Sequence, residues 1–304
     1  MKYILLDTDI GADCDDAVAL ALLLQAEKKG KCEIIGVTAA TTRVGATSAI
    51  NAICDYYGLK KETAVLKPPA IECDKLDNYA CEIMQKYGNT ESDVCSVALT
   101  RRKLAECEEK VTFIAIGPLT GVSRLFESEP DEFSPLTGEE LFNSRVEAFY
   151  CMGGAFTGEK DADGYYIREW NFVQDLPAVA EVLSRCTVPI YFLPKETGEK
   201  VFTGASLKAV ENNPVADCIR FFGTHNPYSG VSERFNRESW DPLTCYFALD
   251  PESGFFKLAT GSAAVDVNGV TSFIHDDSGK NHLIDLAVPA EVVQKAIDEI
   301  ISEN

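Results

Sequence analysis

The sequence has few positive charges and no long apolar run, and each shortage excludes a class of partner. Its 304 residues carry 28 lysines and arginines against 48 acidic residues, a formal net charge of −20. This surplus repels nucleic-acid phosphates and anionic lipids, so we expect neither a nucleic acid polymer nor a membrane as partner. The first apolar run spans only Tyr3 to Leu6, far short of the roughly 20 residues of a spanning helix. We therefore expect a cytoplasmic protein.

Paired cysteines, repeats and linkers are also missing. Eleven cysteines are scattered from Cys14 to Cys245, and no two have the spacing Cys-x-x-Cys. An odd number without such pairs indicates reduced thiols rather than a disulfide framework or structural zinc. Because no Pro/Gly/Ser-rich linker divides the chain, we expect one domain over residues 1–304, with less regular regions near 126–145 and 195–240.

Short apolar runs alternate along the chain with longer segments of helical spacing. The runs that predict buried strands are 3–6, 33–38, 63–66, 111–116, 146–152 and 188–193. The segments that predict helices are 16–26, 46–57, 92–108, 119–126, 176–184 and 289–301. This alternation predicts an α/β fold, an open and mostly parallel sheet flanked by helices. The ligand crevice of such a sheet lies beyond the carboxyl ends of its strands.

Five carboxylates follow the first expected strand within ten residues. They are Asp7, Asp9, Asp13, Asp15 and Asp16, in the stretch DTDIGADCDD that runs directly into an apolar helix. One or two could cap that helix, an effect worth about 0.3–2 kcal/mol. The others would crowd like charges unless they share a cation or a proton. Oxygen ligands suit Ca²⁺ or Mg²⁺ rather than zinc, so the loop predicts a metal site.

Two later motifs carry polar groups that could join this loop. The Gly-Pro dipeptide at 117–118 follows a strand and could free the carbonyl of Ile116 to face a ligand, although a plain turn explains the same residues. Glu169 and Asn171 share a face if their backbone is extended, and they could then bind sugar hydroxyls. A solvated surface is the alternative for this pair.

Together these motifs resemble the inosine-uridine-preferring nucleoside hydrolases, a family of calcium-dependent N-ribosidases. The acidic loop closing on an Asp-Asp pair is similar to the family's N-terminal signature, and further similar pieces occur in the family's order. These are IAIGPLT at 114–120, MGGA at 152–155, EWNF at 169–172 and WDPLT at 240–244. The resemblance covers about residues 2–248, and it implies the family's Rossmann-like fold and a homo-oligomer, either a dimer or a tetramer.

The resemblance also implies a role for each matching residue. The residues implied to ligate calcium are Asp9, Asp16, Asp241 and, through its backbone carbonyl, Ile116. Those implied to line the ribose pocket are Met152, Glu169, Asn171 and Asp241. Asp15 would be the general base, and Asp7 would support the metal shell from outside it. The implied reaction is hydrolysis of the N-glycosidic bond of a nucleoside to free base and ribose, by direct attack of a metal-bound water.

Three departures from the family's pattern affect the expected substrate. Two additional residues lie between Asp9 and the acidic pair and add Asp13, which we expect to be a solvated loop residue. Trp240 stands where the pyrimidine- and inosine-cleaving members carry a histidine that protonates the leaving base. A tryptophan can instead stack on a base, a contact worth about 1–3 kcal/mol, which favours purine nucleosides. The segment 41–45 also lacks the asparagine expected to contact ribose.

Two other functions fit part of the pattern. A haloacid dehalogenase-type phosphohydrolase would use an early Asp-x-Asp as nucleophile and acid, but Gly11 stands where that family carries Thr or Val. A non-catalytic sugar- or nucleoside-binding protein that retained the calcium site would fit the missing acid. His225 lies in a segment rich in turn residues, which could form a lid near the site, although an ordinary surface loop is the simpler interpretation.

Overall fold

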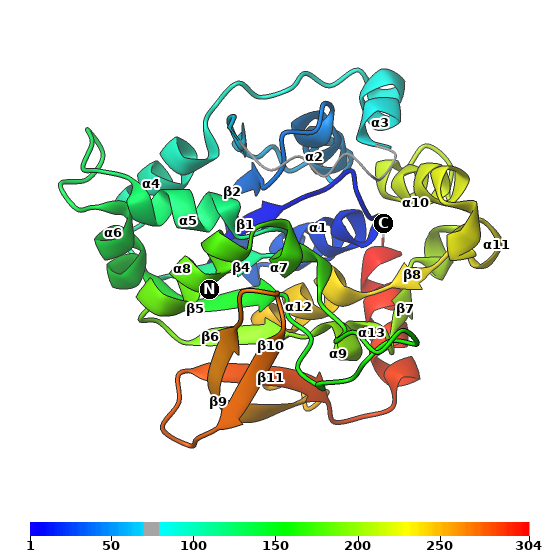
Figure 1. Cartoon of the computed structure of the whole chain (residues 1–304). Coiled ribbons are helices and arrows are strands. Elements are labelled where there is room, and N and C mark those ends of the chain that lie inside the picture. The colour runs from blue at the N-terminus through cyan, green and yellow to red at the C-terminus, as the bar shows by residue number, and fades with distance from the viewer. Residues whose placement is uncertain (70–78, 304) are drawn as a thin grey trace.

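A nine-stranded sheet forms the centre of the computed structural model, which describes residues 1–69 and 79–303 (Figure 1). Its strands are β1 (Lys2–Thr8), β2 (Cys32–Ala39), β3 (Thr63–Val65), β4 (Val111–Ala115), β5 (Val146–Met152), β6 (Ile190–Leu193), β9 (Phe256–Val265), β10 (Thr271–His275) and β11 (Asn281–Leu286). The order across the sheet is β10-β9-β11-β6-β5-β4-β1-β2-β3. Within this sheet pairing is parallel from β3 to β11, and β9 pairs antiparallel with β10 and β11. The predicted open, mostly parallel sheet is confirmed.

Helices cover both faces of this sheet (Figure 1). The helices are α1 (Asp15–Lys28), α2 (Ala46–Tyr56), α3 (Ala80–Tyr87), α4 (Ser96–Glu106), α5 (Thr120–Glu127), α6 (Gly138–Arg145), α7 (Trp170–Gln174), α8 (Leu176–Arg185), α9 (Lys195–Gly198), α10 (Pro214–His225), α11 (Val231–Arg234), α12 (Trp240–Leu249) and α13 (Ala290–Ile301). One core contains side chains of α1, α2, α10, α12 and α13, and the other contains side chains of α4, α5, α6 and α8. Successive residues of β1 pack into opposite cores: Ile4 and Leu6 lie in the first core, and Leu5 lies in the second.

Helix α1 is apolar on every side, and this pattern explains its position. All residues from Asp15 to Ala26 are buried, because α12, α13 and α2 pack around the helix on one side of the sheet. A helix without a polar face has to lie inside the protein. Its first turn is therefore also inside, and it carries the acidic pair Asp15 and Asp16 into the interior.

The segment between β6 and α12 adds a small second sheet beside the main one. It contains α9, β7 (Phe202–Thr203), a 3₁₀ turn at Ala205–Leu207, α10, a second 3₁₀ turn at Pro227–Ser229, α11 and β8 (Arg237–Glu238). Strands β7 and β8 pair antiparallel, and β8 leads directly into α12. Among the described residues, no helix combines the length and the apolar character needed to cross a membrane.

The predicted helix at 92–108 is shorter in the structure, where α4 spans Ser96–Glu106. The residues before it stay extended against the edge of the sheet. The Ser92 hydroxyl donates to the carbonyl of Thr63 at 2.6 Å, and Cys95 forms a parallel bridge with Val65. These bonds with the edge strand, one from a side chain and the others from the backbone, compete with helix formation, which helical spacing alone does not reveal.

Removing apolar volume from α1 should destabilise the protein strongly. Leu22 is fully buried in that helix, so Leu22→Ala should lower the free energy of unfolding by about 2–5 kcal/mol. Val292 on α13 is 43% exposed, and Val292→Ala should change it by less than about 0.5 kcal/mol. Denaturant unfolding of both variants measures the difference, and equal losses would contradict the central position of α1.

Candidate functional site

The carboxyl ends of β1, β4, β5 and β6 open into one cavity of about 310 Å³. The residues expected in the site that line it are Asp9, Asp15, Asp16, Ile116, Met152, Glu169, Asn171, Trp240 and Asp241. They come from six separate stretches of helix, strand end and loop, and parallel pairing brings them to one edge of the sheet. The position predicted from the strand pattern is therefore the position of the cavity.

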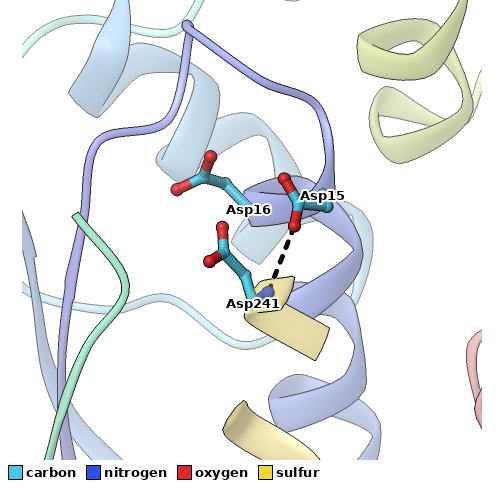
Figure 2. Close-up of side chains that lie close together, drawn as sticks. All are labelled: Asp15, Asp16 and Asp241. Carbon is cyan, nitrogen blue, oxygen red and sulfur yellow. Dashed lines mark hydrogen bonds between the residues drawn. The ribbon is translucent and has the colours of Figure 1, made fainter. Parts of the chain in front are cut away.

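Three buried carboxylates form the centre of the site (Figure 2). Asp15 and Asp16 lie in the first turn of α1 and Asp241 in the first turn of α12, two helices that pack side by side. One oxygen from each carboxylate lies within 4.8 Å of the other two. The backbone N–H of Asp241 donates to Oδ2 of Asp15 at 3.1 Å, which joins the two helix starts.

Burial governs the electrostatics of this group. It raises the pKa of Asp15, Asp16 and Asp241 well above the ordinary value of 3.8, and neighbouring carboxylates raise each pKa further. Burial also raises the pKa of Asp9 to about 6. The donor atoms are all oxygen, they are crowded, and their negative charges repel one another when the carboxyl groups ionise. Such a group fits a hard divalent cation.

Asp9 and Asp7 lie in different positions relative to the three carboxylates of Asp15, Asp16 and Asp241. Asp9 lines the cavity beside them, and Gly117 packs tightly against it: a Cβ at Gly117 would lie 3.0 Å from atoms of Asp9. Asp7 lies on the opposite side of β1, where Thr38 donates to one of its oxygens and Gly121 approaches the other. The side chain of Asp7 is therefore buried behind the site rather than exposed in the cavity.

Glu169 and Asn171 reach the cavity from a helix start and not from the extended backbone that the sequence suggests. Glu169 caps α7 by accepting the N–H groups of Asn171 at 2.6 Å and Phe172 at 3.0 Å. It also accepts the N–H of Gly154 at 3.2 Å. Burial raises the pKa of Glu169 to about 7, although these three bonds oppose the shift. Asn171 Nδ2 lies 3.4 Å from the carbonyl oxygens of Ile116 and Met152.

Trp240 is the first residue of α12, and its side chain is held in a fixed position. Its indole Nε1 donates to the carbonyl of Lys195 at 2.9 Å, and its ring packs so closely on Gly198 that a Cβ there would meet ring atoms at 2.0 Å. The guanidinium of Arg237 lies 5.0 Å from the ring centre. Trp240 and Arg237 therefore lie together on the lining of the cavity.

Asp13 is not the solvated loop residue that the sequence predicts. Its carboxylate pairs with Arg237, with 2.6 Å between Oδ2 and Nη2, and the two side chains are only 25% and 19% exposed. Both residues line the cavity. The prediction was wrong because the partner is 224 positions away in the sequence, and no local pattern indicates such a pair.

Lys195 and Arg237 line the cavity but are absent from the predicted site. A signal exists for Lys195, since it follows the β6 strand at the same edge as the other residues. His225 is the last residue of α10 rather than part of a loop, and its Nε2 lies 2.6 Å from an oxygen of Glu82. It lines a neighbouring cavity of about 510 Å³ that also contains Asp13, Arg237 and Tyr228.

Comparison with known families identifies one family for this chain. The family model described as inosine-uridine preferring nucleoside hydrolase matches residues 4–296. No curated protein matches the sequence. Similar solved structures include an inosine-uridine preferring nucleoside hydrolase from Bacillus anthracis, at 23% identity and TM-score 0.71, with 99% of each chain covered. A plant nucleoside hydrolase has 18% identity and TM-score 0.76, with 100% of this chain and 99% of that one covered. A purine-preferring ribonucleoside hydrolase from Gardnerella vaginalis has 18% identity and TM-score 0.70, covering 99% of both.

The raised pKa values predict how the cation-free protein responds to pH. Asp9 and Glu169 ionise in the unfolded chain near 3.8 and 4.5, but in the folded protein near about 6 and about 7. The folded state thus holds these protons more tightly, so their stabilising contribution is complete below about pH 4 and is lost as the pH rises through about 6 to 7. The unfolding temperature in chelator should fall between about pH 5 and about pH 8.

A divalent cation should reverse this loss, because it competes with protons for the same oxygens. Added Ca²⁺ should therefore raise the unfolding temperature more at about pH 8 than at about pH 5, in thermal melts with matched ionic strength. An equal rise at both pH values would show that the ion binds elsewhere.

Proposed function

The chain belongs to the inosine-uridine preferring nucleoside hydrolase family, which makes it an N-glycosidase, and we propose that it hydrolyses purine nucleosides to free base and ribose in a calcium-dependent reaction. One observation carries the proposal: the buried carboxylates of Asp15, Asp16 and Asp241 share a single cavity with Glu169 and Asn171. The acidic group can hold a cation, and the remaining polar side chains can hold a sugar beside it.

The cation would be held by Asp9, Asp16, Asp241 and the carbonyl of Ile116. Calcium suits this set better than magnesium, because Ca²⁺ accepts six to eight oxygen ligands including backbone carbonyls, whereas Mg²⁺ keeps several waters. When bound, the ion supplies a lowered pKa for the attacking water and a fixed point for sugar hydroxyls. Asp7, behind β1, would support this shell through the strand that carries Asp9.

Asp15 is the proposed general base. One of its oxygens is occupied by the N–H of Asp241 at 3.1 Å, which fixes the plane of the carboxylate. The other oxygen is left to accept a proton from water. Since burial raises the pKa of Asp15 well above its ordinary value, the carboxylate is a stronger base than an exposed aspartate. A cation beside it keeps the group ionised before the reaction.

Glu169, Asn171 and Met152 are proposed to position the ribose. The two oxygens of Glu169 are fixed by three backbone N–H groups, yet an ionised carboxylate offers about four acceptor sites. One site therefore remains for a sugar hydroxyl. Asn171 presents its amide oxygen, since only its Nδ2 contacts the carbonyls of Ile116 and Met152. Groups fixed in this way lower the entropic cost of reaching the reactive geometry.

Trp240 supports the purine preference. It lines the cavity as a large aromatic surface fixed by the Lys195 carbonyl, and aromatic stacking favours the larger bicyclic base. A solved relative of similar fold, from Gardnerella vaginalis, is described as purine-preferring.

Substitutions at the two helix starts should separate catalysis from cation binding. Asp15→Asn should lower kcat by about 100- to 10,000-fold because the base is lost, while the amide oxygen keeps the shape of the site and calcium still binds. Asp241→Ala should lose both turnover and calcium binding. Asp277→Asn, at an exposed turn, is the matched control and should change neither. Calorimetric calcium binding and base release are the two measurements, and full activity of Asp15→Asn would remove it as the base.

Base and sugar release over a panel of purine and pyrimidine nucleosides, with calcium and with chelator, tests the reaction and the substrate together. Inosine, guanosine and adenosine should be cleaved faster than uridine and cytidine, and chelator should abolish release. Comparable rates for uridine and inosine would contradict the purine preference. Calcium and ribose binding with no release from any nucleoside would instead indicate a sugar-binding protein.

A further inference from the structure

Arg237 is held rigidly on all sides at the wall of the cavity. Its Nε donates to both oxygens of Asp13, at 2.8 and 3.0 Å, and its Nη2 donates to Oδ2 of Asp13 at 2.6 Å. Nη1 donates to Glu238 at 2.5 Å. The guanidinium also lies near two aromatic rings, 5.3 Å from the centre of Phe222 and 5.0 Å from that of Trp240. Such a fixed guanidinium can recognise a planar ligand without losing further side-chain entropy.

Part of the donor capacity of Arg237 is unused. A guanidinium has five N–H donors, and within the described part of the chain three of them have acceptors. One N–H on Nη1 and one on Nη2 remain for a ligand. The side chain lies at the boundary of two cavities, that of about 310 Å³ with the acidic group and that of about 510 Å³ beyond it. A substrate in the cavity with the acidic group can therefore reach the guanidinium that carries these two N–H donors.

The chemistry of base departure defines what this cation can do. In the proposed hydrolysis Asp15 takes a proton from water, the water oxygen bonds to C1′, and the electron pair of the broken C1′–N bond goes to the base. Although burial lowers it, the pKa of Arg237 is raised well above its ordinary value by the hydrogen bonds and charge of Asp13. Arg237 therefore cannot act as an acid, but although Asp13 and Glu238 balance its charge, its two remaining N–H groups can donate to negative charge that develops on the base.

We propose that Arg237, positioned by Asp13, binds the acceptor edge of the departing base and makes the enzyme selective for 6-oxopurine nucleosides. This inference rests on the proposed function. The neighbouring N7 and O6 of a 6-oxopurine are two acceptors that a guanidinium can bind together, whereas a 6-aminopurine presents a donor beside N7. The base leaves as an anion paired with Arg237 and takes its proton from solvent after release, when Asp15 also returns its proton to water.

Asp13 is a positioning residue in this arrangement. Its proposed role is to fix the plane of the guanidinium rather than to bind the substrate. The longer acidic loop, which supplies this carboxylate, would thereby compensate for the histidine that Trp240 replaces. Asp13 and Trp240, two of the departures from the family's pattern, would then both serve the binding of the departing base.

The test compares Arg237→Gln, Arg237→Lys and Asp13→Asn with wild type in calcium-saturated protein. Substrates are inosine, guanosine, adenosine and p-nitrophenyl riboside, whose leaving group is a stable anion without help. Arg237→Gln should lower kcat/KM for inosine and guanosine by about 10- to 100-fold and for adenosine by less than about threefold. Arg237→Lys keeps the charge but loses two-point binding, so it should lose the inosine-to-adenosine selectivity. Asp13→Asn should reduce that selectivity by a smaller factor.

The p-nitrophenyl substrate and a control variant keep the test specific. The turnover of p-nitrophenyl riboside should be nearly unchanged in Arg237→Gln, which would show that the hydrolytic groups are intact. Arg234→Gln removes a neighbouring arginine that lies over Phe202 and should change no rate. An equal loss for all four substrates would overturn the inference, because Arg237 would then act on the sugar or on the structure. Equal wild-type rates for inosine and adenosine would overturn it as well.

A binding measurement separates this inference from the proposed function. Free hypoxanthine should bind wild type in the presence of ribose and calcium at least about tenfold more tightly than adenine does, and Arg237→Gln should abolish the difference. If wild type cleaves nucleosides but shows no such difference, the inference fails while the proposed function stands. If wild type cleaves no substrate, including the p-nitrophenyl riboside, both fail.

Discussion

The structure depends on one electrostatic constraint, the burial of three carboxylates where two helices begin. Asp15 and Asp16 are inside because α1 is apolar on every side, and Asp241 is inside because α12 packs along α1. The positive ends of the two helices stabilise negative charge only in part. The remaining charge requires protons or a cation. The same core packing that stabilises the fold therefore creates a group of carboxylates that could hold a metal ion.

Much of this arrangement can be predicted from local sequence. Buried strands and apolar helices are continuous runs, so β1, β2, β4 and β5 lie where the apolar pattern places them, and the edge of the sheet follows from parallel topology. Strands β9 to β11 are absent from that pattern, because each contains only one fully buried residue and their sequences form no continuous apolar run.

The contacts that could not be predicted are those between distant segments. Glu169 and Asn171 are adjacent polar residues in any conformation, but only the backbone N–H groups of α7 decide that Glu169 becomes a cap. From its sequence Asp13 is expected to be a solvated loop residue, but in the fold Arg237 of β8 lies beside it and forms an ion pair with it. Local propensity contains no information about such pairs, since their energies depend on which elements the complete fold brings together.

The two sides of the cavity match the two charges that a broken glycosidic bond produces. In the proposed reaction the ribose gains positive charge, and it lies among carboxylates fixed by helix starts, including Glu169. The base gains negative charge on the side where Arg237 is held between Phe222 and Trp240. Fixed charges of opposite sign stabilise the transition state more than the neutral substrate, because the charges of the substrate separate only as the bond breaks. In this proposal the remaining N–H groups of Arg237 stabilise by hydrogen bonding the negative charge that an acid would neutralise by proton transfer.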